Sequence, residues 1–387
     1  MVALAKARPG SLVIAPHGIA TETARALCTA GARLAIGRAG RRAGFLLAAA
    51  RLVSGISAAG QRLLGSRRWP VRLRRLPHQV TLLARCLAEA SALRTACRLE
   101  PNADAVVILT ANEALHGAAA LLGGEPHLRF VHECVTTEDT AVRLLGRLAR
   151  RGEARVIAVY PTQAVADQFA ERFPNLPAAV GGFAVDDERR LTAAERECGR
   201  AAFDVPGVEA VVCLVGGWWP YKDIDVIDAA LERLKEPLHL VVAGGPLDED
   251  VLQRWRTLPD LRVHVVPGPV GESVLRLVYG AADASLVTRR PGTGKESGLV
   301  MDAVRLGVPL IVSDHDSALT IRLDGQPWAL TFPVGDPAGL ADALDDVIRQ
   351  PPPLPGPDAT GLLGMRSAEG QAEFLTRTFA ALRTKES

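Results

Sequence analysis

The chain has few lysines and few aromatic residues, and it lacks long apolar runs. Only five of its 45 basic residues are lysine, and aromatic residues make up 4% of its 387 positions. Few aromatic side chains offer few platforms for base stacking, so we expect no nucleic-acid partner. The apolar run from Ala43 to Ala50 is far shorter than the ~20 residues of a membrane span. The composition instead predicts a globular protein of about two domains.

Cysteine patterns typical of metal or redox sites are also missing. The six cysteines form no C-x-x-C pair and no metal-like spacing with histidine, so we expect reduced and mostly buried thiols. The segment Met1-Val-Ala-Leu-Ala-Lys6 lacks the apolar core of a signal peptide. This predicts a cytoplasmic protein.

Basic residues gather in one part of the chain. Residues 33–98 carry 14 arginines and a single acidic residue, Glu89, although the net charge of the chain is only +2. Such a segment suits an anionic membrane, a phosphorylated acceptor or a nucleic acid, and a solvated helix face would look the same. Residues 41–64 would make an amphipathic surface helix. We therefore predict peripheral contact with the inner face of the membrane, seen as salt-sensitive binding to anionic liposomes.

Short apolar runs alternate with helical patterns along the chain, which predicts parallel sheets covered on both faces. Strands are expected in the first half at residues 11–16, 33–37, 105–110, 127–132 and 155–160. The second half repeats the pattern at residues 211–215, 239–243, 262–266, 284–287 and 309–312. The sequence therefore predicts an α/β protein with two doubly wound, Rossmann-like domains, residues 1–187 and 188–358. A proline-rich linker precedes a last helix near residues 367–382.

Two glycine loops in the second half each carry a lysine. The first ends in Gly216-Gly-Trp-Trp-Pro-Tyr-Lys222, and the second, Gly292-Thr-Gly-Lys-Glu-Ser-Gly298, opens a helix. In a doubly wound sheet, ligands bind beyond the carboxyl ends of the strands, and helix N-termini favour anions there. The loops therefore predict a diphosphate shared by Lys222 and Lys295. The spacing G-x-x-x-x-G-K-[S/T] is absent, which disfavours a nucleotide triphosphatase.

Four motifs follow one another over residues 205–350: Val215–Asp223, Val242–Pro246, Asp302–Ser313 and Phe332–Leu344. Their order resembles that of the GT-B-fold retaining glycosyltransferases of family four. Val215–Asp223 stands where that family writes G-R-L-x-x-x-K-G, and Val242-Ala-Gly-Gly-Pro246 resembles its hxGxGP strand end. Asp302–Ser313 is similar to EAMAxGxPVIxS, and Phe332–Leu344 is similar to GDpxaLAxAL. The resemblance implies two domains facing a central cleft, with the acceptor in residues 1–187 and the nucleotide-sugar donor in 188–358. Residues 359–387 would return to the first domain.

The resemblance also implies roles for individual residues. Donor contacts would come from Gly216, Gly217, Lys222, Val270, Lys295, Ser297, Gly298, Leu299 and Asp302. Lys222 would hold the diphosphate, Asp302 the ribose, and the backbone near Val270 the base. His132, in Phe130-Val-His-Glu133, would approach the transferred sugar, and His17 and Gly18 would begin the acceptor loop.

Two departures from the family pattern concern charge. Gly217 replaces the family's phosphate-binding arginine, and Lys295, Arg289 or Arg290 would have to supply the missing positive charge. The E-x7-E motif is broken as well, because Gly294 stands eight residues before Asp302. Glu296 would be the displaced sugar-binding carboxylate. The alternative interpretation is that Glu296 is an ordinary solvent-exposed glutamate at the start of a helix.

The function implied by the resemblance is transfer of a hexose from a UDP- or GDP-sugar to an acceptor hydroxyl, with retention and without metal or other cofactor. The acceptor would be a small molecule, lipid-linked or phosphorylated. Gly217 and the broken carboxylate motif also suit a catalytically silent GT-B-like binding or scaffold protein. A nucleotide-sugar epimerase on the same fold is a third interpretation.

Overall fold

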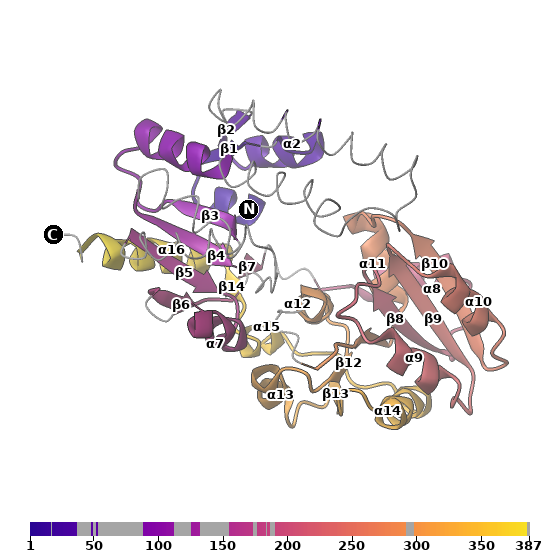
Figure 1. Ribbon diagram of the computed structural model, residues 1–387. Helices are drawn as coiled ribbons and strands as arrows, with labels where there is room; N and C mark the ends of the chain where they lie inside the picture. The colour runs from indigo at the N-terminus through magenta and orange to yellow at the C-terminus, as the bar shows by residue number, and fades with distance from the viewer. Residues whose placement is uncertain are drawn as a thin grey trace. The chain divides into compact units, whose positions relative to one another are not determined.

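The computed structural model describes residues 1–16, 18–36, 48, 52, 88–111, 125–131, 155–172, 176–182, 184–185, 190–291 and 298–384. The chain forms two compact units. Figure 1 labels their helices and strands and colours them by residue number. Unit 1 comprises Met1–Asp186 and Arg366–Ser387, and unit 2 is the continuous stretch Asp187–Met365. Most of residues 33–98 lies outside the described ranges, so the membrane contact stays a prediction. Within those ranges, no helix is both long enough and apolar enough to span a membrane.

Unit 1 is built on a four-stranded parallel sheet with the order β3-β4-β5-β6. These strands span Val107–Ala111, His127–Val131, Val156–Tyr160 and Ala178–Val180. A parallel pair, β1 (Leu12–Ala15) and β2 (Arg33–Ile36), accompanies α1 (Val2–Ala7), α2 (Thr21–Thr29) and α7 (Gln163–Arg172). Strands β4 and β5 are buried at every position, as expected for parallel strands covered on both faces. The five strands predicted in this half are confirmed.

The last helix of the chain, α16 (Ala368–Thr384), completes unit 1 by packing on β4 and β5. Its buried side chains Leu375, Phe379 and Leu382 join the apolar residues of those strands in one core. Just before it, β14 (Arg366–Ser367) pairs in parallel with β7 (Ala184–Val185). The chain therefore leaves unit 1 after β7 and returns to it at β14.

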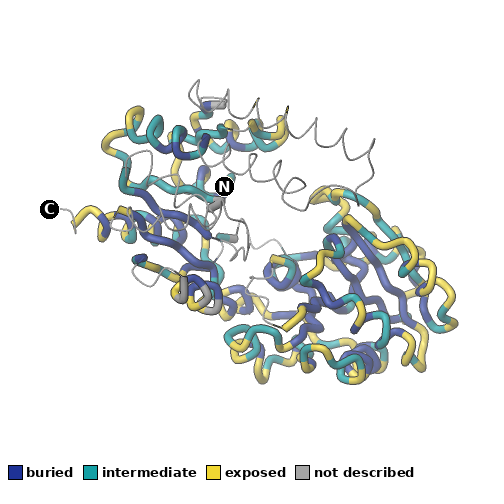
Figure 2. The backbone as a smooth tube through the Cα atoms, in the orientation of Figure 1, coloured by how far each residue is buried: buried dark blue, intermediate teal, exposed yellow. Residues whose placement is uncertain are grey.

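Unit 2 contains a six-stranded parallel sheet with the order β10-β9-β8-β11-β12-β13. In chain order the strands are β8 (Ala210–Val215), β9 (Leu238–Gly244), β10 (Leu261–Pro267), β11 (Ala284–Val287), β12 (Leu310–Ser313) and β13 (Ala329–Phe332). Figure 2 shows most of this sheet in the dark blue of buried residues. The strand order reverses between β8 and β11, and their carboxyl ends form the position where doubly wound folds bind ligands.

Side-chain caps fix where several helices of unit 2 begin. The helices are α8 (Ala193–Ala202), α9 (Ile224–Leu231), α10 (Glu249–Arg256), α11 (Glu272–Ala281), α12 (Gly298–Leu306), α13 (Ser317–Leu323), α14 (Pro337–Arg349) and α15 (Ala359–Leu362). Thr192 and Glu195 form a capping box at α8, and Asp248, Asp316 and Asp336 accept backbone N–H groups at α10, α13 and α14. These are sequence signals that end a loop and begin a helix.

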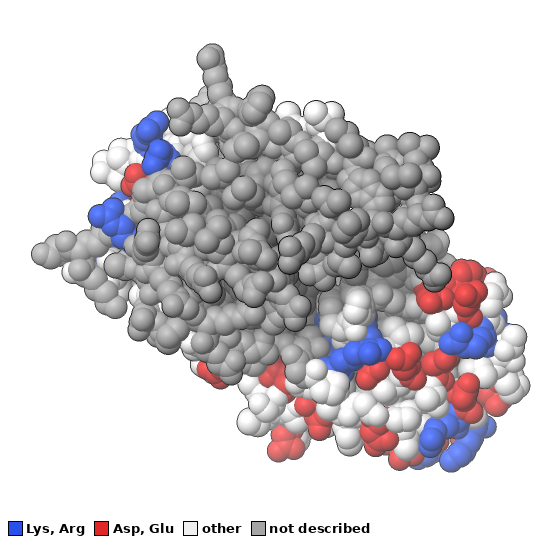
Figure 3. All heavy atoms as spheres, in the orientation of Figure 1, with Lys and Arg blue, Asp and Glu red and all other residues white. Residues whose placement is uncertain are grey.

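The surface of unit 2 mixes both signs of charge, as Figure 3 shows for the face it draws. Arg254 lies 2.6 Å from Asp228, and Arg256 lies 2.8 Å from Glu249. Because these pairs are partly exposed to water, each contributes at most about 1 kcal/mol. The charge of this face is therefore distributed, in contrast to the single-sign run in residues 33–98.

The cysteines differ in part from expectation. The four in the described ranges form no disulfide with one another. Their expected burial is wrong for Cys28 and Cys198, which are exposed, and Cys97 is only half-buried. Cys28 and Cys198 lie on helices whose buried positions are the neighbouring Leu27 and Gly199.

Candidate functional site

The loops after β8, β9 and β10 meet through their backbones at the carboxyl edge of the unit 2 sheet. Three hydrogen bonds join them: Gly216 N to Ala243 O (2.6 Å), Trp218 N to Pro246 O (2.7 Å) and Gly268 N to Gly244 O (3.0 Å). A Cβ at Gly244 would lie 2.8 Å from the backbone of Gly216. Glycine is therefore required at Gly244 for the loops to approach so closely.

Gly216 and Gly217 are glycines for different reasons. Gly216 has φ of +85°, and a Cβ there would face the Lys222 Nζ at 3.1 Å and Leu299 at 3.8 Å. A Cβ at Gly217 would lie 2.5 Å from the carbonyl carbon of Gly245 and closer still to its oxygen. The loop after β9 therefore lies directly against the Gly217 backbone. No larger side chain fits at this position unless the backbone moves.

Lys222 folds back onto the end of β8. Its Nζ donates to the carbonyl oxygens of Val215 (2.7 Å) and Gly216 (3.0 Å), and the residue is only 5% exposed. Both acceptors are neutral, so neither balances the charge. Burial, followed by the positive charge of Arg289, lowers the pKa of Lys222 to about 7. An ammonium has three donors, so one N–H is left for a ligand beyond the strand.

Arg289 lies just past the end of β11, the strand beside β8. Its guanidinium sits 4.6 Å from the centre of the Tyr221 ring, and its backbone N donates to Ser313 Oγ (3.1 Å). The next residue, Arg290, ties the two strand ends together, because its N donates to Tyr221 O (2.9 Å). The Arg290 side chain binds Asp225 Oδ2 on α9 (2.7 Å). The two arginines therefore contact different elements: Arg289 lies against Tyr221 and the end of β12, whereas the Arg290 side chain binds α9.

Helix α12 begins beside the end of β8, because a Cβ added at Gly216 would lie 3.8 Å from the Leu299 side chain. Asp302 follows one turn later, and its Oδ1 accepts a hydrogen bond from Arg305 Nη2 (3.2 Å). Burial raises the pKa of Asp302, and the charge of Arg305 opposes that shift. Arg305 also lies 3.7 Å from Glu272, at the start of α11 and two residues after Val270. Asp302 and the Val270 loop are thus linked through Arg305.

The structure describes only some of the residues expected at the site. It brings together Gly216, Gly217, Lys222 and Leu299, with Gly298 at the start of the same helix as Leu299 and Asp302. In unit 1, Gly18 follows β1 with φ of +88°. Outside the described residues lie His17, His132, Lys295, Glu296 and Ser297. Within the part of the chain that is described, no three His, Cys, Asp or Glu side chains group as metal ligands.

Sequence reasoning missed the part played by Tyr221. Its ring supports the Arg289 guanidinium, and its carbonyl anchors the backbone of Arg290. An available signal was the cluster of three aromatic residues in the loop after β8, in a chain with only 4% aromatic residues. Arginine stacks well on aromatic faces, so such a cluster near paired arginines indicates this contact.

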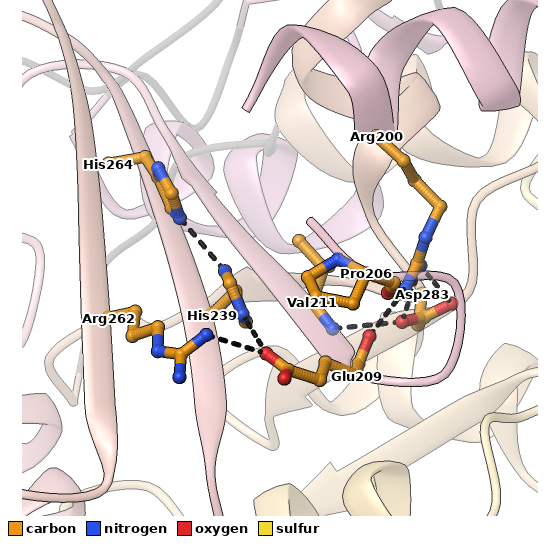
Figure 4. A network of polar contacts seen from close by, with 8 residues as sticks. All are labelled: Arg200, Pro206, Glu209, Val211, His239, Arg262, His264 and Asp283. Atoms are coloured by element: carbon orange, nitrogen blue, oxygen red, sulfur yellow. Dashed lines mark hydrogen bonds and ion pairs between the residues drawn. The ribbon is translucent and has the colours of Figure 1, made fainter. Parts of the chain in front are cut away.

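A second polar cluster lies at the opposite, amino edge of the sheet (Figure 4). The rings of His239 and His264 stack at 5.2 Å and share a hydrogen bond of 2.9 Å between Nδ1 and Nε2. His239 Nε2 also contacts Glu209, which accepts from Arg262 (3.1 Å). Burial lowers the pKa of His264, which favours its neutral form. These side chains bind one another and tie together the starts of β8, β9 and β10.

Comparisons with solved structures show the fold. The chain has the GT-B fold, and it is similar to Anabaena HepE in complex with UDP at a TM-score of 0.64 and 13% identity, covering 99% of this chain and 94% of that one. A trehalose-phosphate synthase of Burkholderia xenovorans, in complex with glucose-6-phosphate, is similar at a TM-score of 0.55 and 15% identity, covering 79% and 78%. At these identities the likeness concerns the fold.

A family model matches part of the second unit. Residues 209–350 match the model of the glycosyl transferases group 1. A D-inositol 3-phosphate glycosyltransferase of Mycolicibacterium smegmatis is 28% identical over 194 residues, which cover 48% of this chain. The match spans only 41% of that relative's length.

Proposed function

We propose that the chain is a glycosyltransferase that moves a sugar from a nucleotide-diphosphate donor, bound by unit 2, to an acceptor hydroxyl, bound by unit 1. The observation that carries the proposal is the buried Lys222 at the end of β8, beside the start of α12 and within the family segment. The UDP complex of HepE supports a nucleoside diphosphate as the ligand class. The name of the mycobacterial relative supports a phosphorylated acceptor.

Charge stabilisation at the leaving group is the proposed source of catalysis. The bond between the sugar C1 and the diphosphate oxygen breaks, and Lys222 with the first amides of α12 stabilises the charge that develops. A new bond forms between C1 and the acceptor oxygen, whose proton passes to the departing diphosphate. Attack from the face that the diphosphate leaves retains the configuration at C1. Retention and independence of metal rest on the family resemblance.

Further roles in the proposal concern the rest of the substrates. Asp302 binds the ribose, and the backbone near Val270 meets the base. His132 and Glu296 act at the transferred sugar, whereas His17 and Gly18 contact the acceptor. The link between Asp302 and the Val270 loop through Arg305 supports a nucleoside at that side of the site.

A catalytically silent binding protein is the second candidate. Gly217 favours it, because the position of the family's phosphate-binding arginine has no room for that side chain. A silent protein would bind a nucleoside diphosphate without transferring or hydrolysing a sugar. Binding and turnover must therefore be measured separately.

The test combines thermal unfolding with turnover. One of UDP, GDP and dTDP should raise the melting temperature of the wild type, because a ligand that binds only the folded state stabilises it. Replacing Lys222 with Met should remove that shift and slow nucleoside diphosphate release from the matching sugar donor at least ~100-fold. Lys235→Met is the matched control, because that lysine side chain is 80% exposed.

The outcomes separate the two candidates. Transfer or donor hydrolysis that depends on Lys222 supports the glycosyltransferase. Binding with no turnover, over phosphorylated and neutral acceptors, leaves the silent protein. Failure of all three nucleotides to stabilise the wild type would contradict the glycosyltransferase and favour a scaffold protein.

A further inference from the structure

A nucleoside diphosphate carries more negative charge than the single Lys222 ammonium balances. The family that this chain resembles adds an arginine in the loop after its first donor-domain strand, where this chain has Gly217. A Cβ at Gly217 already meets the Gly245 carbonyl carbon at 2.5 Å, so an arginine cannot be placed there without moving two loops. A second cation at this site must therefore come from an element other than the Gly217 position.

Two arginines after β11 are described near this position, and their surroundings differ. Arg290 is half-exposed, and its guanidinium binds Asp225 at 2.7 Å and lies 4.0 Å from Asp223. Its charge is therefore already balanced by carboxylates of the loop and of α9. Arg289 is only 3% exposed and lies against the Tyr221 ring. Burying a guanidinium this deeply is costly, which points to a function for its charge.

The position of Arg289 is fixed from both neighbouring strands. β11 pairs with β8 on one side and with β12 on the other. Ser313, at the end of β12, accepts the Arg289 backbone N–H, and Tyr221 in the loop after β8 lies under the guanidinium. Its charge also lowers the pKa of Lys222, which lies beyond the end of β8, and of His315, which lies beyond the end of β12.

We propose that Arg289 is the second diphosphate-binding cation of this site and replaces the arginine for which Gly217 leaves no room. The inference rests on the proposed function, because it assigns a residue to the same donor diphosphate. Tyr221 lies under the guanidinium and also shares a side-chain hydrogen bond with it. The planar N–H groups of an arginine can bind phosphate oxygens in pairs. Lys222 and Arg289 are like charges buried at adjacent strand ends, and a diphosphate between them removes their repulsion.

The test compares ligands with and without phosphate. The nucleotide among UDP, GDP and dTDP that the wild type binds most tightly is titrated by calorimetry, beside its own nucleoside. Arg289→Gln should weaken diphosphate binding roughly 10- to 100-fold and leave nucleoside affinity within about twofold. Damage to the fold would instead weaken both ligands. Arg290→Gln is the matched control and should bind both as the wild type does.

Arg289→Lys is a second control for a folding defect, because lysine keeps the positive charge and places an aliphatic chain over Tyr221. It should bind the diphosphate more tightly than Arg289→Gln and less tightly than the wild type, since a point charge cannot make paired contacts. If Arg289→Gln keeps the wild-type preference for diphosphate over nucleoside, the inference is wrong while the proposed function stands. If the wild type binds none of the three nucleotides, both fall.

Discussion

Lys222 should couple ligand binding to a proton. Its pKa of about 7 leaves it largely neutral at pH 8, whereas a bound diphosphate favours the charged form. Binding should therefore take up close to one proton at pH 8, and affinity should fall as pH rises above 7, by up to about tenfold per unit. Calorimetry in Tris and HEPES, whose ionisation enthalpies differ, measures the uptake. The residual binding of Lys222→Met at high nucleotide concentration should take up no proton, and an uptake of zero in the wild type would contradict this assignment.

Residues of the candidate site differ in how far the sequence predicts them. Lys222 was predictable, because it is one of five lysines and lies in a glycine loop after a buried strand. The choice between Arg289 and Arg290 was not, because it depends on how deeply each side chain is buried and on the residues that surround it. Those properties come from Tyr221 and Asp225, which are distant from the arginines in sequence.

At the scale of elements, the meeting of three loops at the carboxyl edge makes Gly217 critical for stability. Gly217→Ala should lower the free energy of unfolding of unit 2 by about 1–3 kcal/mol or more, because its Cβ overlaps the Gly245 backbone. Gly207→Ala is the control: its Cβ meets nothing within 4 Å, and it should be neutral or slightly stabilising. Urea unfolding measures both. Equal free energies of unfolding for the two variants would show that the loops move to make room for the added methyl group at little energetic cost.

Long strands were easier to predict than short ones. All ten expected strands are present, because buried parallel strands read as continuous apolar runs. β13 was missed, since it is only partly buried and its Thr331 is exposed. β7 and β14 have two residues each, too few to show a period, and they pair across a separation of about 180 residues in sequence.

For the whole molecule, the two units should respond to different changes. Phe379 is 1% exposed in the core of unit 1, so Phe379→Ala should cost about 3–5 kcal/mol there. In calorimetric unfolding, this variant should lower the unfolding temperature of unit 1. A bound nucleoside diphosphate should instead raise the unfolding temperature of unit 2. Arg377→Ala, on the exposed face of the same helix, should change neither. A single transition that moves with both the core mutation and the nucleotide would contradict independent units.

The return of α16 to the first unit also has a consequence for synthesis on the ribosome. Unit 2 is one uninterrupted stretch and can close its sheet as soon as residue 365 has emerged. The apolar side of β4 and β5, by contrast, stays uncovered until residues 368–384 have been made. The unit that begins first is thus finished last, and until then the uncovered apolar side of its sheet is a surface that a chaperone can bind.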